Sequence, residues 1–413
     1  MSPQEGLLRG YSRVAMSFSR RLDWSARANR IAIARREREG RGLPTIDLTQ
    51  TNPTQVGLSY PADALAAALA RGAAAPYQPD PRGLRSAREA LASDLSVAGD
   101  RVSPDDLILT ASTSEAYSFL FKLLLDAGDG VVSMTPSYPL IEHLVAAELG
   151  QTRHVALDLV DAGSSRRWAV DVEAVVRQID PGVRAVVVIH PNNPTGSCLT
   201  LDEQDAIAEV CRSRDIALLS DEVFCDYPLG RRPDAAPSAA RRDDVLSFSL
   251  GGLSKSAALP HWKLGWIRAG GPMTQRRRAL EALELIADNF LSVATPVQAA
   301  LSDILPLGRM MRGRVMTRIE GNLECLRDTV SRNLAVDLLP IEGGWSAVLR
   351  VPRLMAEEDL VLALLSECGV LVQPGYFFDF ATEAFLVVSL LPPVEEFRTG
   401  VERIVEYFAD ASS

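Results

Sequence analysis

The stretch Val183-Arg184-Ala185-Val186-Val187-Val188-Ile189-His190-Pro191-Asn192-Asn193-Pro194-Thr195-Gly196 joins a short apolar run to a rigid turn. The apolar run has the length of a strand that is buried on both faces, as in a parallel sheet. Prolines and a glycine fix the turn, so an amide side chain within it is held in one direction. The stretch therefore predicts a buried strand over Val183–Ile189 that presents polar groups at its carboxyl end.

The same pattern recurs on both sides of this stretch, where short apolar runs alternate with amphipathic helical segments from about residue 107 onward. This alternation is typical of a mostly parallel sheet that helices cover on both faces. The fold class is therefore α/β. Further strands are expected at Leu107–Thr110, Gly130–Met134, Ile216–Leu219, Val245–Ser249 and Leu264–Arg268, and helices at Glu115–Asp126 and Asp202–Arg214.

The pattern changes after about Gln298, which indicates a second and smaller α+β domain. There, helical segments precede an alternating run at Gly344–Val351, a helix at Glu357–Cys368 and a strand at Phe385–Leu390. We expect residues 1–50 to form an N-terminal arm that packs with the small domain. Residues 51–298 would form the large domain that holds the site, and residues 299–413 the small one. The stretch 230–244 is expected to be a surface loop.

Composition excludes several classes of function. The chain has 413 residues, 47% of them hydrophobic, and a net charge of −10, which disfavours a dedicated nucleic-acid binder. Its four histidines and five cysteines lack metal-ligand spacing, so we expect no metal and free thiols in a reducing compartment. No apolar run is long enough to span a membrane. The arginine-rich N-terminus is read as a helical arm rather than a transit peptide, because acidic residues interrupt it. A cytoplasmic protein is expected.

Two further side chains of unusual type are expected at the carboxyl ends of strands, where ligands of open parallel sheets collect. Lys255 follows the strand at Val245–Ser249 after a glycine-containing turn; alone, it would be read as a solvated surface lysine. Asp221 directly follows the strand at Ile216–Leu219. It is either a helix cap, half of an ion pair, or the partner of a buried cation such as a protonated pyridine.

The order of these motifs resembles that of a known family. Asn193-Pro194-Thr195-Gly196 comes first, then Asp221-Glu222-Val223, then Ser254-Lys255, with Lys263 eight residues later and a glycine shortly after it. This looks like the fold-type I, class I/II aminotransferases, and the similarity runs from about Ile46 to Gly375. The resemblance implies pyridoxal phosphate as the cofactor and small-molecule amino donors and oxo acceptors as partners. It implies that Lys255 is the Schiff-base lysine, that Asp221 pairs with the pyridine nitrogen, that Asn193 donates to the 3′-oxygen, and that Tyr138 stacks on the ring.

The resemblance also implies a phosphate site and a dimer. A helix start at Ser112-Thr113-Ser114 supplies backbone N–H groups and hydroxyls, although a capping box of Ser112 with Glu115 accounts for the same residues. Lys263 matches the family's basic phosphate ligand, which is more often Arg. Tyr77 resembles the tyrosine that reaches the phosphate of the other subunit, which implies a homodimer. Gly252 stands where many relatives have a serine, for which Ser254 or Ser249 is the expected substitute.

The chain departs from the family at the end that binds the substrate carboxylate. Val387 occupies the position of the usual arginine, Thr51 that of a glycine, and Phe224 that of a tyrosine. Either another arginine binds the carboxylate, with Arg350 and Arg82 as candidates, or the substrate has no α-carboxylate there. Five aromatic residues are candidates either for the substrate pocket or for the core: Trp24, Trp345, Tyr376, Phe377 and Phe378.

Three functions remain open at this stage. In the first, Lys255 is neutral near pH 7 because burial depresses its pKa, and it moves the α-proton of the substrate during ping-pong transfer of an amino group to a 2-oxo acid or related carbonyl compound. The second is another pyridoxal-phosphate chemistry on the same scaffold, such as that of a C–S lyase, decarboxylase or racemase, which Val387 keeps open. The third is a regulatory protein that only retains the fold.

Overall fold

The computed structural model describes residues 18–22, 29–96, 100–163, 165–230, 232–291, 293–332 and 334–410. Trp24, one of the candidate pocket residues, lies outside these ranges. Within them, no helix combines the length and the apolar character that crossing a membrane requires.

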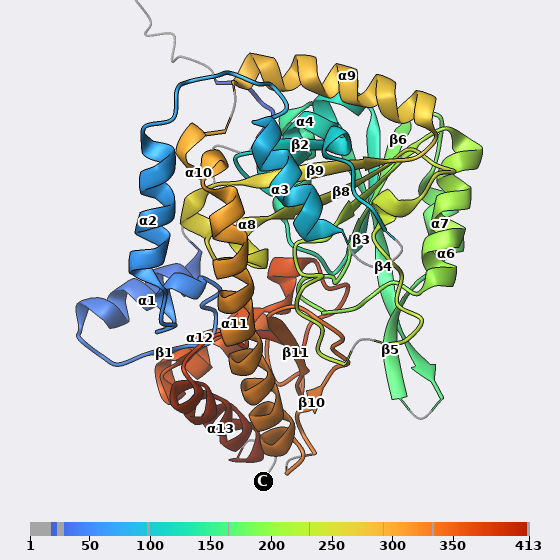
Figure 1. Cartoon of the computed structure of the whole chain (residues 1–413). Coiled ribbons are helices and arrows are strands. Elements are labelled where there is room, and N and C mark those ends of the chain that lie inside the picture. Colours follow the sequence, from blue (N-terminus) through green and yellow to red (C-terminus); the bar gives the residue numbers. More distant parts are fainter. Residues whose placement is uncertain are drawn as a thin grey trace, which may run out of the picture.

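An eight-stranded sheet forms the centre of the larger part of the molecule, with the order β2-β9-β8-β7-β6-β3-β4-β5 (Figure 1). Neighbouring strands from β8 to β4 run parallel, whereas β9 is antiparallel to β2 and β8, and β5 is antiparallel to β4. The predicted mostly parallel sheet is confirmed. The strands are β2 (Leu107–Thr110), β3 (Gly130–Thr135), β4 (Gln151–Ala162), β5 (Ser165–Val170), β6 (Val183–Ile189), β7 (Ala217–Asp221), β8 (Ser247–Gly252) and β9 (Gly265–Gly270).

Helices cover both faces of this sheet, which explains why β6 is apolar throughout. Val186 and Val188 belong to an apolar cluster with residues of α7, whereas Ala185 and Val187 belong to another with residues of α4 and α9. Successive side chains of a strand point to opposite faces, so a strand between two helical layers is apolar at every position. The helices of this part are α2 (Ala62–Ala73), α3 (Arg85–Leu95), α4 (Thr113–Leu124), α5 (Leu140–Ala147), α6 (Val172–Gln178), α7 (Leu201–Arg214), α8 (Leu253–Ser256), α9 (Met273–Phe290) and α10 (Thr295–Ala299).

The smaller part contains a four-stranded antiparallel sheet in the order β10-β11-β14-β13. Its elements are β10 (Asp337–Leu338), β11 (Ser346–Arg350), α12 (Glu357–Ala363) with a π-helical turn at Leu364–Cys368, β12 (Val370–Leu371), β13 (Gln373–Pro374), β14 (Phe385–Ser389) and α13 (Val394–Asp410). Helix α1 (Arg30–Gly40) packs on α12, and β1 (Ile46–Asp47) pairs with β12. The segment from α1 to β1 therefore contacts this smaller part.

The 30-residue helix α11 (Leu301–Val330) connects the two parts (Figure 1). Leu301, Ile304 and Leu305 at its beginning pack in a cluster with residues of α2 and α3, while its residues from Met311 onward pack in the core of the smaller part. The expected boundary at residue 298 lies just before this helix. Because α11 belongs to both cores, the division into domains stays a prediction.

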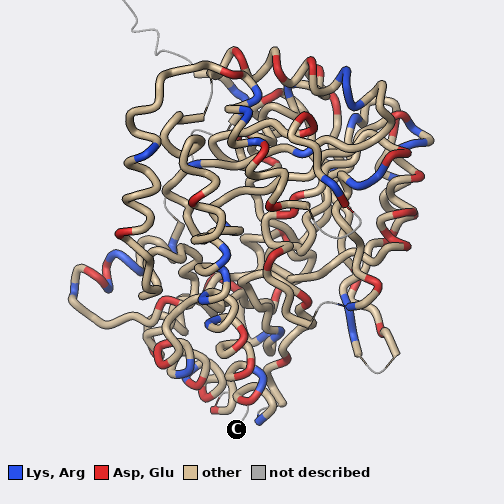
Figure 2. The backbone as a smooth tube through the Cα atoms, viewed as in Figure 1, with Lys and Arg blue, Asp and Glu red and all other residues tan. Residues whose placement is uncertain are grey.

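Charged residues are spread over the surface of the molecule. Figure 2 shows lysine and arginine interspersed with aspartate and glutamate along the outer helices of the described chain, while the central strands are mostly uncharged. Arginines pair with nearby carboxylates at several places, as Arg85 does with Glu89, Arg212 with Glu209 and Arg242 with Asp244. This distribution differs from the basic stripe that a nucleic-acid-binding surface displays.

Three local predictions were wrong. Strand β8 continues to Gly252, so Gly251 and Gly252 belong to the strand and not to a turn; the indole of Trp266 lies against Gly251. Asp221 is the last residue of β7 rather than the residue after it. The stretch 230–244 is not simply a surface loop, because Ala236 and Ala239 are fully buried against the sheet.

Candidate active site

The carboxyl ends of β2, β3, β6, β7 and β8 meet at one edge of the large sheet, because these strands run in the same direction. A cavity of about 280 Å³ lies at this edge. Its wall brings together six of the predicted residues, namely Thr113, Ser114, Tyr138, Asn193, Asp221 and Lys255. The smaller part closes the cavity with Trp345, Ser346, Gln373 and Phe378. Residues of the large sheet and of the smaller part thus form one site.

Lys255 lies in the short helix α8, directly after β8. Its Nζ atom is 4.6 Å from the centre of the Trp345 ring and 5.3 Å from that of Phe224. Desolvation lowers the pKa of Lys255 to about 8, and the charge of Asp221 only partly offsets this effect. The backbone around the lysine is anchored, since Tyr227 donates a 2.6 Å hydrogen bond to the Lys255 carbonyl. A held lysine with a depressed pKa suits an amine that must act in its neutral form.

Asp221 is buried at the end of β7 and faces the same cavity. Burial raises the pKa of this carboxyl to about 6, although Val223 N–H donates to Oδ1 and the Tyr117 hydroxyl donates to Oδ2, each at 3.1 Å. Burial also raises the pKa of Tyr117, so that residue remains a donor. The two donors are neutral, and the charge of Lys255 offsets only part of the effect of burial, so the carboxylate still lacks a full counter-charge. A cationic group in the cavity would supply one.

Asn193 and Tyr138 approach the cavity from the ends of β6 and β3. The Asn193 side-chain oxygen accepts a 3.3 Å hydrogen bond from Ser346 Oγ. This contact orients the amide, so that its NH₂ group is available as a donor. Tyr138 is half exposed and lines the cavity, as an aromatic ring that covers a planar ligand would.

The N-terminus of α4 supplies the other donors. Thr113 and Ser114 line the cavity, and Ser112 caps the helix by accepting a hydrogen bond from Glu115 N–H. The capping box is incomplete, because the Glu115 carboxylate accepts from Ala111 N–H instead of Ser112 N–H. Strand β9 approaches the N-terminus of α4 closely at Gly265, where an added Cβ atom would lie 3.0 Å from the backbone of Ser112. The free N–H groups and the positive end of the helix dipole favour an anion here.

Four predicted site residues are absent from the described wall of the cavity: Ser112, Ser254, Lys263 and Tyr77. Lys263 is exposed. It lies two residues before Gly265, which approaches the N-terminus of α4. Tyr77 is 66% exposed on the loop between α2 and α3. The roles of these four residues stay predictions.

The substrate end of the cavity differs from the sequence-based expectations. Arg350 lies at the far end of β11 and pairs with Asp337, and Arg82 pairs with Glu284, so neither candidate arginine lines the cavity. Val387 is 1% exposed within an apolar cluster. Of the aromatic candidates, Trp345 and Phe378 line the cavity; Tyr376 and Phe377 do not. Thr51 and Phe224, which replace a glycine and a tyrosine of the family, are also in the wall.

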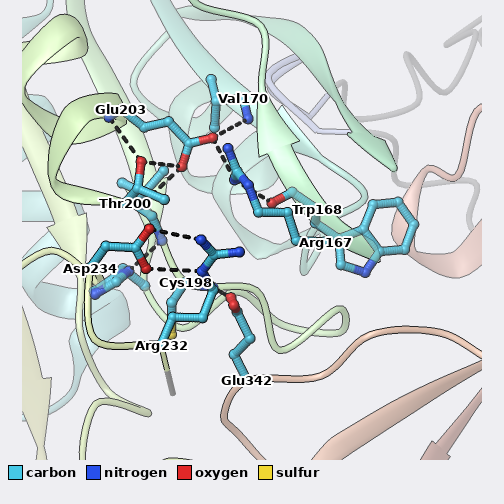
Figure 3. Close-up of polar contacts among 11 residues, drawn as sticks. Arg167, Trp168, Val170, Cys198, Thr200, Glu203, Arg232, Asp234 and Glu342 are labelled. Atoms are coloured by element: carbon cyan, nitrogen blue, oxygen red, sulfur yellow. Dashed lines mark hydrogen bonds and ion pairs between the residues drawn. The ribbon is translucent and has the colours of Figure 1, made fainter. Parts of the chain in front are cut away.

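Hydrogen bonds between Glu342 and the segment that contains Gly196 and Cys198 join the loop before β11 to the loop after β6; Figure 3 shows Glu342 beside Cys198. Glu342, three residues before Trp345, accepts a 2.7 Å hydrogen bond from Cys198 N–H, and its own N–H donates to the Gly196 carbonyl. Close by, Glu203 completes a capping box with Thr200 and accepts from Arg167 at 2.8 Å (Figure 3). The loop after β6 is therefore held from both sides, which keeps Asn193 next to Ser346.

Comparison with known proteins identifies the family. Residues 45–404 match the family model described as aminotransferase class I and II. The chain belongs to the class I and II aminotransferases. Among curated relatives, it is 28% identical to the glutamate-pyruvate aminotransferase AlaA of Escherichia coli K12, over 90% of this chain and 92% of that protein. It is 32% identical to nicotianamine aminotransferase B of Hordeum vulgare, over 93% of this chain and 71% of that protein.

Solved structures show the same fold. The alanine aminotransferase of Pyrococcus furiosus superimposes with a TM-score of 0.82 at 22% identity, over 93% of this chain and all of that one. This likeness confirms the predicted fold. The family match confirms the predicted family and enzyme class: the protein is an aminotransferase. The readings as a lyase, decarboxylase or racemase, and as a regulatory protein, are not favoured.

Sequence reasoning missed three polar residues of the described cavity wall, namely Tyr117, Ser346 and Gln373. Tyr117 follows Thr113 by one helical turn, a spacing that places both on one side of α4 and was available in the sequence. Ser346 and Gln373 reach the site through the small sheet, whose register the sequence does not reveal.

Proposed function

We propose that the cavity binds pyridoxal phosphate and that the enzyme transfers an amino group from an amino acid or amine to a 2-oxo acid or related carbonyl compound. The observation that carries the proposal is the joint burial of the Lys255 amine and the Asp221 carboxylate in one cavity beside the N-terminus of α4. The three groups match an aldehyde carbon, a pyridine nitrogen and a phosphate, respectively. The residues therefore fit this cofactor.

Each residue has a role that follows from its chemistry. Lys255 Nζ would hold the cofactor covalently and, once displaced by the incoming amine, move a proton to and from the reacting carbon. Asp221, held by Tyr117 and Val223, would pair with the protonated ring nitrogen. Asn193 would donate to the ring oxygen, Tyr138 would stack on the ring, and Thr113 and Ser114 would bind the phosphate with Ser112, Ser254 and Lys263 nearby. When bound, the cofactor supplies an electron sink for the reacting carbon.

A homodimer is part of this proposal. Tyr77 is exposed and lies outside the described cavity wall of its own chain, as expected of a side chain that reaches the phosphate of a second subunit. Burial of an exposed tyrosine against a partner would also stabilise the dimer. A cytoplasmic location likewise stays a prediction.

The proposal is tested by the half-reaction. Purified protein is loaded with pyridoxal phosphate and incubated with a panel of amines and amino acids without an oxo acceptor. One equivalent of pyridoxamine phosphate per chain, returned to pyridoxal phosphate when a carbonyl acceptor is added, is the expected result. Release of carbon dioxide, a thiol or racemised donor without pyridoxamine phosphate would contradict it.

A further inference from the structure

We propose that Gln373 recognises the group bonded to the reacting carbon of the substrate, and that it selects substrates in which this group is an uncharged carboxamide or hydroxymethyl group. The inference rests on the proposed function, because it concerns the same cavity.

The register of the small sheet places Gln373 at the substrate end. Val387 on β14 pairs with Gln373 on β13 and with Val348 on β11, so the three side chains form a row across one face of the sheet. The two valines are buried in an apolar cluster with Trp168 and Phe378. Gln373, in contrast, lines the cavity together with Phe378. It is therefore the polar member of a row that otherwise belongs to the core.

The Gln373 amide is available for a ligand. Its side chain is partly buried and makes no hydrogen bond with any residue in the described part of the chain. A primary amide carries two N–H donors and one acceptor oxygen. It therefore complements a carboxamide, which has the same groups, or a hydroxyl, which donates and accepts. Ser346, which also lines the cavity, donates its hydroxyl hydrogen to the side-chain oxygen of Asn193.

The charges of the cavity wall disfavour a carboxylate. Among the described wall residues, Lys255 is the single cation and Asp221 the single anion. Lys255 is required at the reacting carbon, and Arg350 and Arg82 are paired elsewhere. A carboxylate placed between Gln373, Trp345 and Phe378 would lose its hydration without gaining a counter-charge. An uncharged amide or alcohol loses less hydration, and Gln373 replaces its water contacts.

The test uses three donors that differ only in the group next to the amino-bearing carbon: L-alanine, L-alaninamide and L-alaninol. The half-reaction of the cofactor-loaded enzyme is followed for each one. A second measurement does not depend on turnover: propionamide and propionate, which lack the amino group, are titrated into the same protein by ligand-observed NMR. We expect the amide and the alcohol to react, and propionamide to bind, at least about tenfold better than their carboxylate counterparts.

Two variants assign the preference to Gln373. Gln373→Arg introduces a cation and should raise the ratio of propionate to propionamide affinity by about tenfold or more. Gln373→Glu keeps the shape of the side chain but removes its N–H donors, and it should weaken the binding of propionate further. The matched control is Gln275→Arg, the same change on the exposed surface of α9, and should leave both affinities unchanged.

The outcomes separate this inference from the proposed function. Wild-type protein that binds propionate as tightly as propionamide, or more tightly, overturns the role of Gln373. The same holds if Gln373→Arg and Gln275→Arg have equal ratios of propionate to propionamide affinity. Neither result bears on amino transfer. Preferential binding of propionamide without pyridoxamine formation from any donor upholds the recognition by Gln373 and contradicts the proposed function instead.

Discussion

The Nζ atom of Lys255 lies 4.6 Å from the centre of the Trp345 ring. The lysine follows β8 of the large sheet, and the tryptophan precedes β11 of the small sheet, so this contact spans the two parts of the molecule. A cation over an indole face is attracted by the ring quadrupole, whereas burial in the same place costs hydration. Desolvation lowers the pKa of Lys255 to about 8, and the charge of Asp221 offsets part of this effect.

Asp221 should make the stability of the cofactor-free protein depend on pH. Burial raises the pKa of this carboxyl from 3.8 to about 6, so the folded state binds its proton more tightly than the unfolded chain does. The contribution of Asp221 to the free energy of unfolding is then greatest below about pH 4 and is lost as the pH rises through about 6. The wild type should lose on the order of 2 kcal/mol relative to Asp221→Asn across this window.

Urea unfolding of both cofactor-free proteins at several pH values between 4 and 8 measures this difference directly. Groups that do not interact with Asp221 titrate alike in both proteins and cancel. A difference that stays constant across the range would show that Asp221 does not carry a raised pKa.

Ser114→Ala should weaken cofactor binding by about three- to tenfold, because the hydroxyl lines the cavity at the start of α4 and one hydrogen bond would be lost. Ser118→Ala is the matched control: it lies one turn further along α4, where its hydroxyl contacts Lys122 and Glu148. Equilibrium dialysis with pyridoxal phosphate gives the affinity of each variant. Equal affinities would place the phosphate elsewhere.

Gly252→Ser should be tolerated and should raise the affinity for the cofactor about three- to tenfold by adding a donor at the position of the serine in many relatives. Gly252 has an extended backbone with a φ angle of −178°, and an added Cβ would approach its neighbours no closer than 3.4 Å. Gly251→Ser is the contrasting variant, because its Cβ would lie 2.4 Å from the Trp266 ring.

We expect Gly251→Ser to lose about 2 kcal/mol or more of stability, and Gly252→Ser to lose little. Thermal unfolding of the two cofactor-free variants, followed by titration with pyridoxal phosphate, checks both statements. A Gly252→Ser protein that folds normally but binds the cofactor more weakly than the wild type would refute the assignment of this position to the phosphate site.

The sequence predicts the large sheet well because its central strands are apolar at every position, as β6 and β7 are. It does not predict the β4–β5 hairpin, because β4 is mostly exposed or half buried and shows no apolar run. Lys255, Asp221 and Asn193 were predicted as one site because each follows a predicted strand and because the order of their motifs resembles that of the class I/II aminotransferases. The helical spacing from Thr113 places Tyr117 on the same side of α4, but its hydrogen bond to Asp221 depends on the tertiary structure. Gln373 was missed because its pairing with Val387 depends on the register of the small sheet.

The central claim is that Lys255 holds pyridoxal phosphate, and the most direct test is borohydride reduction of the cofactor-loaded protein followed by peptide mass mapping. The account predicts an absorption band between about 300 and 500 nm that borohydride removes, with a phosphopyridoxyl adduct on the peptide containing Lys255 and none in Lys255→Ala. An adduct on a different lysine of the wild type, or the same adduct pattern in Lys255→Ala, would contradict it.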